Sequence, residues 1–133
     1  MRLTTRSEYG LLALIFLARQ DPEGCFSVEA IAQSQQIPAK FLEQILLSLK
    51  RAGYVRSVRG SRGGYRLAKP AAQITIAEVV RLLDGALAPT YSVSRYFYEP
   101  TPIEREQSLI RFFQAIATQI SAVMETTSIA DVT

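Results

Sequence analysis

The chain has 133 residues, of which 48% are hydrophobic, and a formal net charge of +3 at pH 7, which fits a soluble globular protein with one core or a core and an appendage. It contains no histidine and a single cysteine, Cys25. This composition excludes an intramolecular disulfide framework, removes most zinc, haem and catalytic-triad sites, and fits a cytoplasmic protein in a reducing compartment.

Charge is distributed unevenly along the chain. Residues 1–69 hold 11 basic and 5 acidic side chains, whereas residues 70–133 hold 4 basic and 7 acidic ones. A basic half favours a polyanionic partner, and nucleic acid is favoured over a membrane because no basic amphipathic helix is evident. We therefore expect the first half to bind nucleic acid.

The first expected element is a helix from Thr5 to about Gln20. Thr5 and Glu8 have the spacing of a capping box, in which a hydroxyl and a carboxylate each bind the other's backbone N–H. The helix is apolar on nearly all sides, so we expect it to be buried. The basic start of the chain resembles a signal peptide only weakly, because Glu8 interrupts it, no cleavage site follows and the apolar run is too short to cross a membrane.

Two more helices are expected before residue 53. Ser27 can cap a short helix that ends near Ser34, and residues 35–37 then form a tight turn. The second helix covers residues 38–52, with proline in its first turn and glycine after its last turn. Its apolar residues recur at helical spacing on one stripe, and the opposite face is largely polar. The stripe is Leu42, Ile45, Leu46 and Leu49, and the opposite face carries Lys40, Glu43, Gln44, Leu47 and Arg51.

A β-hairpin is expected directly after this helix. Two short β-rich runs, residues 54–59 and 65–67, flank the glycine-rich stretch Gly60 to Gly64, and glycine allows the positive φ angles of a turn. From Lys50 to Lys69 there are seven basic residues and no acidic one. The hairpin is therefore strongly basic.

The order of these elements is that of a winged helix-turn-helix, in which a short helix, a turn, a second helix and a hairpin follow one another. We predict a mainly α fold with a small β-hairpin wing. A DNA-binding domain would cover residues 1–85, and residues 86–133 would form an effector or linker loop and a long dimerisation helix.

The second half begins with another capped helix. Thr75 and Glu78 form a second capping box, and the helix ends at Gly85, with Ile76, Val79, Val80 and Leu83 facing inward. Residues 86–102 contain three prolines and four aromatic rings, too apolar for a bare linker. We expect this stretch to pack on something. Its rings, Tyr91, Tyr96, Phe97 and Tyr98, either fill space or form an effector pocket or partner-docking surface.

A long helix is expected last. Thr101 and Glu104 have the spacing of a third capping box, and the helix should reach about Thr126. At roughly twenty-five residues it would be about 37 Å long, more than so small a domain can cover, so a second subunit is expected to cover it. A short turn near residues 128–132 would end the chain. The expected dimerisation residues are Leu109, Phe112, Phe113, Ile116, Ile120 and Val123, and Met124 extends their stripe.

The chain carries short motifs over its full length, at Met1–Thr4, Phe41–Gln44, Leu49–Gly53, Val58–Gly60, Gly63–Leu67 and Ser128–Asp131. Together these motifs resemble one known family, the Rrf-two (Rrf2) family of winged-helix transcription regulators. The resemblance implies a homodimer that binds palindromic promoter DNA, with the long helix crossing between subunits and the last segment packed on the partner's DNA-binding domain. It also implies a sensing site in the loop before the long helix, where many members place three cysteines for an iron-sulfur cluster.

The sequence departs from this family pattern in the sensing loop. Residues 84–106 contain neither cysteine nor histidine, and Cys25 alone cannot replace three cluster ligands. We therefore expect no metal site and no cofactor, and we favour an inert Cys25 over a redox switch. In the turn, Gln36 stands where the family usually has glycine and Pro38 where it usually has serine, which can strain the turn and removes a phosphate-binding hydroxyl.

The expected DNA contacts follow from the outward face of the second helix and from the wing. Lys40 and Arg51 would contact phosphates, whereas Glu43 and Gln44 would read bases, since glutamate can accept from cytosine and glutamine can pair with adenine. A wing arginine can enter the minor groove. The plainer reading of these residues is an ordinary solvated surface. The full expected set is Arg2, Lys40, Phe41, Glu43, Gln44, Arg51, Arg59, Gly60, Ser61, Arg62, Gly63 and Tyr65.

The sequence is compatible with three classes of function. The favoured one is a sequence-specific DNA-binding regulator, a dimeric repressor that needs no iron-sulfur cluster and responds to a small-molecule or protein effector. The alternative is a winged-helix protein-interaction module whose aromatic loop docks a partner or small ligand. An enzyme is not expected, because the chain lacks histidine, a nucleophile-base pair and a glycine-rich loop that precedes a helix.

Overall fold

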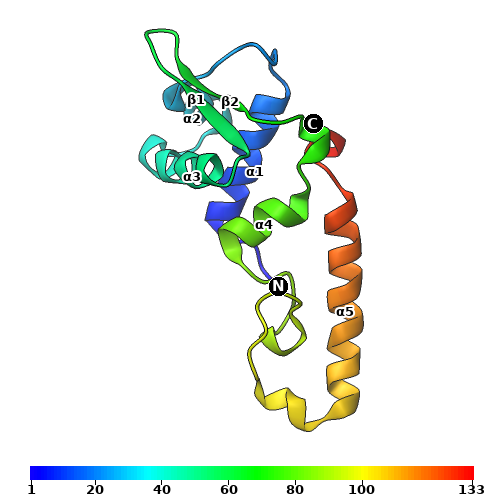
Figure 1. Cartoon of the computed structure of the whole chain (residues 1–133). Helices are drawn as coiled ribbons and strands as arrows, with labels where there is room; N and C mark the ends of the chain where they lie inside the picture. The colour runs from blue at the N-terminus through cyan, green and yellow to red at the C-terminus, as the bar shows by residue number, and fades with distance from the viewer.

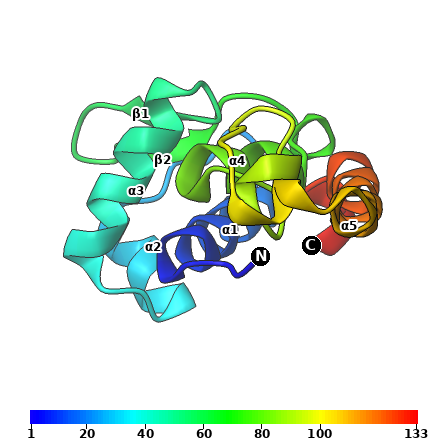
Figure 2. The same cartoon turned by 90° about the horizontal axis from the view of Figure 1, so that it is seen from below.

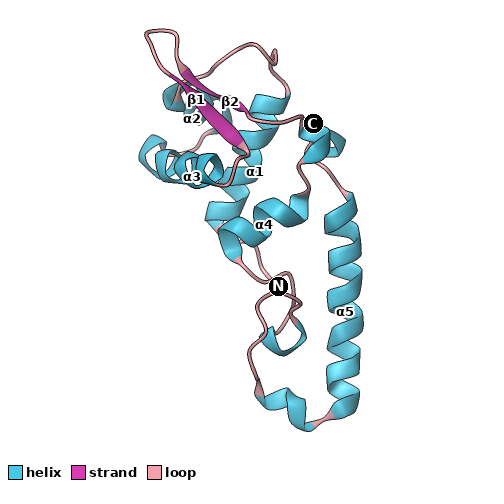
Figure 3. Ribbon diagram, in the orientation of Figure 1, coloured by secondary structure: helices cyan, strands magenta, loops and turns pink.

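The structure is a computed structural model that describes all residues, 1–133. It is mainly helical with one antiparallel hairpin, as predicted (Figure 1, Figure 3). Four short 3-10 turns, η1 to η4, connect or end the longer elements. The helices and strands are α1 (Thr5–Ala18), α2 (Val28–Gln35), α3 (Ala39–Arg51), β1 (Val55–Val58), β2 (Gly64–Leu67), α4 (Ile76–Asp84) and α5 (Gln107–Thr126).

Two parts of the molecule are easily distinguished. We call residues 1–85 together with residues 127–133 the winged head, and residues 86–126 the arm. Figure 1 shows that the arm descends from α4 as an irregular segment and returns as α5, which ends at the head. Seen from below, the hairpin and α3 lie on one side of the molecule and α5 on the other (Figure 2).

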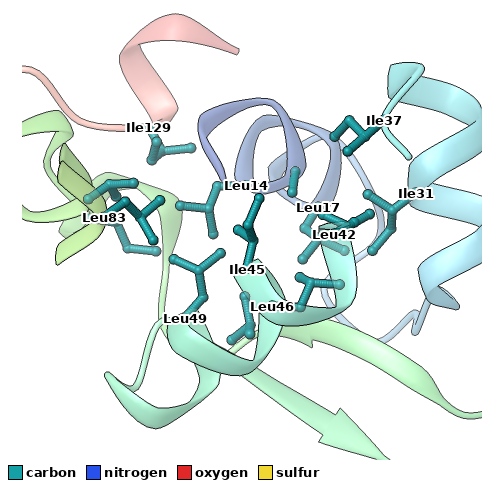
Figure 4. Packing of buried hydrophobic residues seen from close by; sticks show 14 of the residues in the cluster. Leu14, Leu17, Ile31, Ile37, Leu42, Ile45, Leu46, Leu49, Leu83 and Ile129 are labelled. Atoms are coloured by element: carbon teal, nitrogen blue, oxygen red, sulfur yellow. The ribbon is translucent and has the colours of Figure 1, made fainter. Parts of the chain in front are cut away.

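The core of the head forms between α1, α2 and α3. The predicted stripe of α3 is confirmed, because Leu42, Ile45, Leu46 and Leu49 are all fully buried. They pack against Leu14 of α1 and other apolar side chains, as Figure 4 shows. Burial of one complete face of α3 leaves its opposite face to solvent.

Helix α1 differs from the prediction at its start and on its surface. Its N-cap is Thr4 rather than Thr5, and the expected capping box with Glu8 does not form. The cause lies far along the chain, because the backbone N–H of Thr4 donates to the Asp84 carboxylate at 3.0 Å and the Thr4 hydroxyl donates to it as well. The helix is also not buried all round, since Leu12 is exposed.

The turn between α2 and α3 contains an unusual backbone conformation. Ser27 caps α2, as predicted, by accepting from the Ala30 backbone N–H at 3.1 Å. Gln36 follows α2 with a φ of 56°, the left-handed region that disfavours residues with a Cβ. Pro38 stands at the N-cap of α3 and provides no side-chain cap. The substitution of Gln36 for glycine therefore does place strain in the turn.

The capping box of α4 and the end of this helix at Gly85 are confirmed. The chain's last segment packs beside α4, where the Ile129 backbone N–H donates to the Ile74 carbonyl at 2.8 Å and the Ile129 side chain is fully buried in the core. The resemblance implied that this segment packs on a partner subunit, but in this structure it completes the head of its own chain.

The long helix is shorter than predicted. Residues Pro102–Arg105 form the 3-10 turn η3, and α5 begins only at Gln107 after extended backbone at Glu106. The expected capping box is absent because both of its side chains have other partners: the Thr101 hydroxyl donates to Ser92 at 2.7 Å, and the Tyr98 hydroxyl donates to Glu104 at 2.6 Å. The 20 residues of α5 span about 30 Å at 1.5 Å per residue. The predicted end at Thr126 is confirmed.

The segment between α4 and α5 packs only in part. Leu87 and Val93 are buried, which agrees with the expectation that this stretch contacts the rest of the molecule. Its four aromatic side chains are not buried, and they are 41–58% exposed. Those four are Tyr91, Tyr96, Phe97 and Tyr98.

Candidate nucleic-acid interface

The outward face of α3 carries the side chains expected to contact DNA. Lys40, Glu43, Gln44 and Arg51 are all exposed, because the buried leucine stripe occupies the other side of the helix. Phe41 is 42% exposed and lies edge-on against Tyr9 with ring centroids 5.6 Å apart. The face is therefore largely polar and charged, with the Phe41 ring at its N-terminal end and an exposed Leu47.

The wing is an antiparallel hairpin in which Val55 pairs with Leu67 and Val58 pairs with Gly64. Its turn, residues 59–62, is exposed and carries Arg59, Gly60, Ser61 and Arg62. Gly63 closes the turn so tightly that a Cβ there would lie 2.1 Å from the Val58 carbonyl oxygen. Glycine at this position is therefore required by the close approach of the backbone.

Two wing residues point toward the head instead of outward. Tyr65 is partly buried against the core, and its backbone pairs with Phe26 through two hydrogen bonds of 2.7 and 2.9 Å. Arg66 is also partly buried, lies 3.9 Å from Glu23 and has a buried Nε without a hydrogen-bond partner. The Tyr65 backbone and the Arg66 side chain connect the wing to the loop before α2. Both side chains are less exposed than those of the turn.

The exposed cations of α3 and the wing turn have no acidic partners. The structure contains two ion pairs, Arg66 with Glu23 and Arg81 with Glu125, and neither involves an exposed side chain of α3 or the turn. Lys50 and Arg56 also belong to this cationic surface; they are not among the expected contacts, although both lie in the basic run from Lys50 to Lys69. The exposed cations of this surface are Lys40, Lys50, Arg51, Arg56, Arg59 and Arg62.

The base of the wing is fixed to α4 by a small polar cluster. Lys69 lies over the Tyr54 ring, 4.9 Å from its centroid. Burial and the nearby Glu78 carboxylate raise the pKa of Tyr54. Burial opposes ionisation of Glu78, but hydrogen bonds from Thr75 and the charge of Lys69 outweigh it and lower the pKa of Glu78. The charged Glu78 carboxylate therefore caps α4 and also interacts with Lys69 and Tyr54 at the base of the wing.

Two arginines near the N-terminus have different surroundings. Arg6, which sequence reasoning did not select, donates from Nη2 to the Ser48 hydroxyl at 2.7 Å and so ties α1 to α3. Arg2 is exposed and borders a hollow with Asp84 and Pro89. Figure 1 shows the N-terminus at the junction of head and arm, away from the wing. Arg2 is therefore set apart from the other expected DNA contacts.

The expected dimerisation residues of α5 differ in exposure. Leu109, Phe112 and Val123 are 38%, 58% and 65% exposed. The other three, Phe113, Ile116 and Ile120, are partly buried, and Ile120 packs with Met124 on the buried cluster of Ala77, Val80 and Leu87 in the same chain. The face that remains open to a partner is therefore centred on Leu109, Phe112 and Val123.

The side chains of this chain do not fit an iron-sulfur cluster. The lone thiol, Cys25, lies in the loop between α1 and α2, outside the segment that precedes α5. No group of three or more cysteine, aspartate or glutamate side chains is placed to hold a metal ion. Cluster ligation needs several thiolates at one site, and this chain does not supply them.

None of the helices of this chain combines the length and the apolar character needed to cross a membrane.

Comparison with known proteins identifies relatives of the whole chain. Residues 3–133 match a family model described as Rrf2, iron-dependent transcriptional regulator. The helix-turn-helix regulator slr0846 of Synechocystis is 46% identical over 89 residues, which span 67% of this chain and 60% of that protein. The fold is similar to the structure titled as CymR, the global cysteine regulator of B. subtilis, with TM-score 0.80, 30% identity and coverage of 99% and 95%. It is also similar to T. potens IscR, with TM-score 0.76, 27% identity and coverage of 99% and 85%.

Proposed function

The chain belongs to the Rrf2 family of transcriptional regulators, and from this premise we propose that it represses transcription by binding palindromic promoter DNA as a homodimer. The observation that carries the proposal is the cationic surface on one side of the head, where α3 and the wing turn present exposed charges without acidic partners. Such a surface favours the phosphate backbone of DNA. We place the protein in the cytoplasm, together with its DNA, and assign it no catalytic role.

Helix α3 is proposed to lie in the major groove. Lys40 and Arg51 stand at its two ends, where they can contact phosphates on either side of the groove and so set the position of the helix. Glu43 and Gln44 lie between them on the same exposed face. A carboxylate can accept from the cytosine amino group and an amide can pair with adenine, so these two residues are the proposed base readers.

The wing turn is proposed to reach the adjacent minor groove. Arg59 and Arg62 are exposed on a turn that the tight approach of Gly63 holds in shape. Arginine is attracted to a narrow minor groove because the negative potential is concentrated there. Tyr65 and Arg66, which face the head, would serve the wing by fixing its angle, and Arg2 would contact DNA only if the duplex extends toward the junction of head and arm.

Dimerisation is proposed to use the open face of α5. Leu109, Phe112 and Val123 form an exposed apolar stripe that a second copy of the chain can cover, with a gain of about 25 cal/mol per Å² of apolar surface. Two heads held in this way would present two copies of α3 to half-sites about one helical turn, or 34 Å, apart. A palindromic site follows from the two-fold symmetry of such a dimer.

Regulation is proposed to proceed without an iron-sulfur cluster. The relatives' family model is described as iron-dependent, but this chain offers one cysteine and no histidine. We propose that the signal is received by the segment between α4 and α5, in which Tyr91, Tyr96, Phe97 and Tyr98 are exposed.

If regulation needs no iron-sulfur cluster, protein purified without oxygen should be colourless, and the Cys25→Ser variant should bind its operator as the parent does. A visible absorbance with iron and sulfide in fixed ratio to protein would contradict this proposal.

A salt titration of duplex binding tests the proposal against the interaction-module alternative, which no comparison supports. A DNA reader should lose affinity steeply as salt rises, since phosphate contacts release counterions, and should keep its preference for one sequence. Matched duplexes with a promoter fragment and with a shuffled sequence provide the control. Weak binding to both duplexes with no salt dependence would refute DNA recognition by this surface.

A further inference from the structure

The arm contains a cavity that DNA binding does not use. Its volume is about 660 Å³, within the range of roughly 300–1,000 Å³ that is typical of small-molecule sites. It is lined by the segment from Ser92 to Phe97, by the middle and end of α5, and by Arg81 of α4. Helix α4, helix α5 and the segment between them therefore meet at one cavity.

The lining of this cavity has an apolar base and a polar rim. Leu87, Val93 and Ala117 are buried and form its apolar part. The rings of Tyr96 and Phe97 lie beside it, and hydroxyls and an amide from α5 face it from the other side. An occupant with an apolar or aromatic body and a polar end would match both parts.

Two guanidinium groups give the cavity a positive end. Arg81 pairs with Glu125 at 2.5 Å and lies 5.1 Å from the Tyr96 ring centroid. Arg95 lies 5.0 Å from the same ring centroid, is exposed and has no acidic partner. Since Glu125 is the only acidic side chain in the lining and is already paired, the charge left unpaired at the cavity is positive.

A dimer formed through the exposed stripe would leave this cavity open. Phe112 and Ser121 are nine positions apart, as are Val123 and Gln114, and nine residues are two and a half turns at 3.6 residues per turn. The stripe residues therefore point away from the cavity residues, on opposite sides of α5. The cavity and the dimer face can be occupied at the same time.

We propose that this cavity binds a small organic monocarboxylate with an aromatic or branched apolar body. The carboxylate would pair with Arg95 through charge-assisted hydrogen bonds, and the body would rest between Tyr96 and the apolar base. The occupant would touch both α4 of the head and α5 of the arm, so its binding can bias how the two parts are held. This regulatory consequence rests on the proposed function, whereas the binding itself does not.

Phenylacetate and its neutral amide, phenylacetamide, are a matched pair of probes for this site. Each is titrated to millimolar concentration into uniformly ¹⁵N-labelled full-length protein, and the backbone amide signals are followed by NMR. Phenylacetate is expected to shift the signals of residues 92–97 and 117–125 in a saturable manner, and phenylacetamide is expected to bind at least about tenfold more weakly because it cannot form the charged hydrogen bonds. Equal binding of acid and amide, or no saturable shift at these residues, would overturn the proposal.

Three variants localise the charge. Arg95→Gln should weaken phenylacetate binding about tenfold, whereas Arg95→Lys should retain most of it, because hydrogen bonds to a charged group are the stronger ones. Arg19→Gln removes an exposed charge at the end of α1 and should bind as the parent does. If Arg95→Gln binds phenylacetate as tightly as Arg19→Gln does, Arg95 is not the anion site and the proposal fails.

Operator binding is measured on the same variants without probe, by fluorescence anisotropy. Arg95→Gln should bind the operator as the parent does, since the segment between α4 and α5 that carries Arg95 belongs to the arm, away from α3 and the wing (Figure 1). Failure of phenylacetate binding with intact operator binding would therefore reject the ligand site alone. Failure of operator binding in the parent would reject the proposed function and leave the ligand result standing.

Discussion

The head and the arm of this molecule bury apolar surface in different ways. In the head, the apolar faces of α1, α2 and α3 meet one another and the stripe of α3 is fully buried. In the arm, α5 covers only the side that carries Ala117 and Ile120, and the stripe of Leu109, Phe112 and Val123 stays at the surface. The head buries its apolar faces within one chain, whereas the arm leaves an apolar stripe exposed, which the proposed dimer would cover.

This difference also separates two roles. The head holds rigidly the charges that would meet DNA, because α3 and the wing are anchored by the core, by the Phe26 pairing and by the cluster around Glu78. The arm has exposed rings, a cavity and an open helix face. In the proposed function, the well-packed head would recognise DNA, and the arm, with its exposed apolar surface and cavity, would form the dimer and bind the effector.

The largest expected effect comes from a charge on the open face of the arm. Val123→Glu should dissociate the dimer, since burial of an unpaired carboxylate in an apolar interface has a large free-energy cost. It should also weaken operator binding by about 10²- to 10⁴-fold, because the two heads no longer bind the two half-sites as one molecule. Analytical ultracentrifugation and anisotropy measure the two losses. Gln114→Glu, nine positions away on the opposite side of α5, is the control and should remain dimeric. A dimeric Val123→Glu protein would show that another surface holds the subunits together.

The next effect tests the wing. Replacement of both Arg59 and Arg62 by alanine should weaken operator binding by about 2–4 kcal/mol and reduce the slope of log affinity against log salt by about two. Stability should be unchanged, because both side chains are exposed and unpaired. Circular dichroism melting provides that control. An unaltered salt slope would mean that the wing turn does not contact DNA.

A smaller and more selective effect is expected from α3. Glu43→Ala and Gln44→Ala should each relax the preference at one or two base pairs, worth about 1–3 kcal/mol of discrimination, while affinity for unrelated DNA stays nearly constant. Competition with operators mutated one base pair at a time measures this. Lys40→Ala is the contrasting variant, which should lower affinity for all sequences alike. If all three variants behaved alike, the division between base readers and phosphate contacts would be wrong.

The junction of head and arm gives a pH-dependent prediction. Burial opposes ionisation of Asp84, but hydrogen bonds from the Thr4 hydroxyl and backbone N–H outweigh it and lower the pKa of Asp84 below its usual 3.8. A carboxyl with a lowered pKa stabilises the fold at neutral pH, and this contribution is lost as pH falls below 3.8 through the lower folded value. Asp84→Asn should therefore cost about 1 kcal/mol at pH 7 and flatten the decline in stability in that acidic range. Urea unfolding at a series of pH values checks this, and an equal decline in parent and variant would contradict it.

The smallest effect concerns the turn before α3. Gln36→Gly should raise the free energy of unfolding by about 0.5 kcal/mol, because the left-handed backbone at φ 56° costs an L-residue about 1–2 kcal/mol and the greater flexibility of glycine offsets part of the gain. Gln33→Gly, in the regular part of α2, should lower it by about 1 kcal/mol. Chemical denaturation compares the two, and loss of stability in both variants would show that Gln36 is not strained.

Much of the head could be predicted from sequence because its signals are local. The leucines of α3 repeat with the period of a helix, and Thr75 and Glu78 form the capping box that their spacing indicates. Thr101 and Glu104 have an equivalent spacing, yet their groups are taken by Ser92 and Tyr98. Thr4 replaces Thr5 as the cap of α1 because of Asp84, 80 positions away. Such competition is decided by tertiary neighbours that the sequence pattern does not contain.

In the candidate interface, too, features set by local sequence patterns could be predicted, and features set by tertiary contacts could not. Exposure of Glu43, Gln44 and Arg51 follows directly from the buried stripe on the other side of α3. The inward positions of Tyr65 and Arg66 depend on the pairing of the wing with Phe26 and on Glu23, which no local pattern indicates. On α5, periodicity marked the apolar residues but could not tell which side meets its own chain and which side remains for a partner.

Selection of bound duplexes from a random pool tests the central claim most directly. The full-length protein is expected to enrich a palindrome whose half-sites are centred about 10 base pairs, or one helical turn, apart. Cytosine and adenine should recur where α3 lies, and an A·T-rich step should recur where the wing lies. In the same selection Val123→Glu should enrich at most a half-site. Recovery of no preferred sequence, or of one without two-fold symmetry, would contradict the account of a dimeric regulator that reads DNA through α3 and the wing.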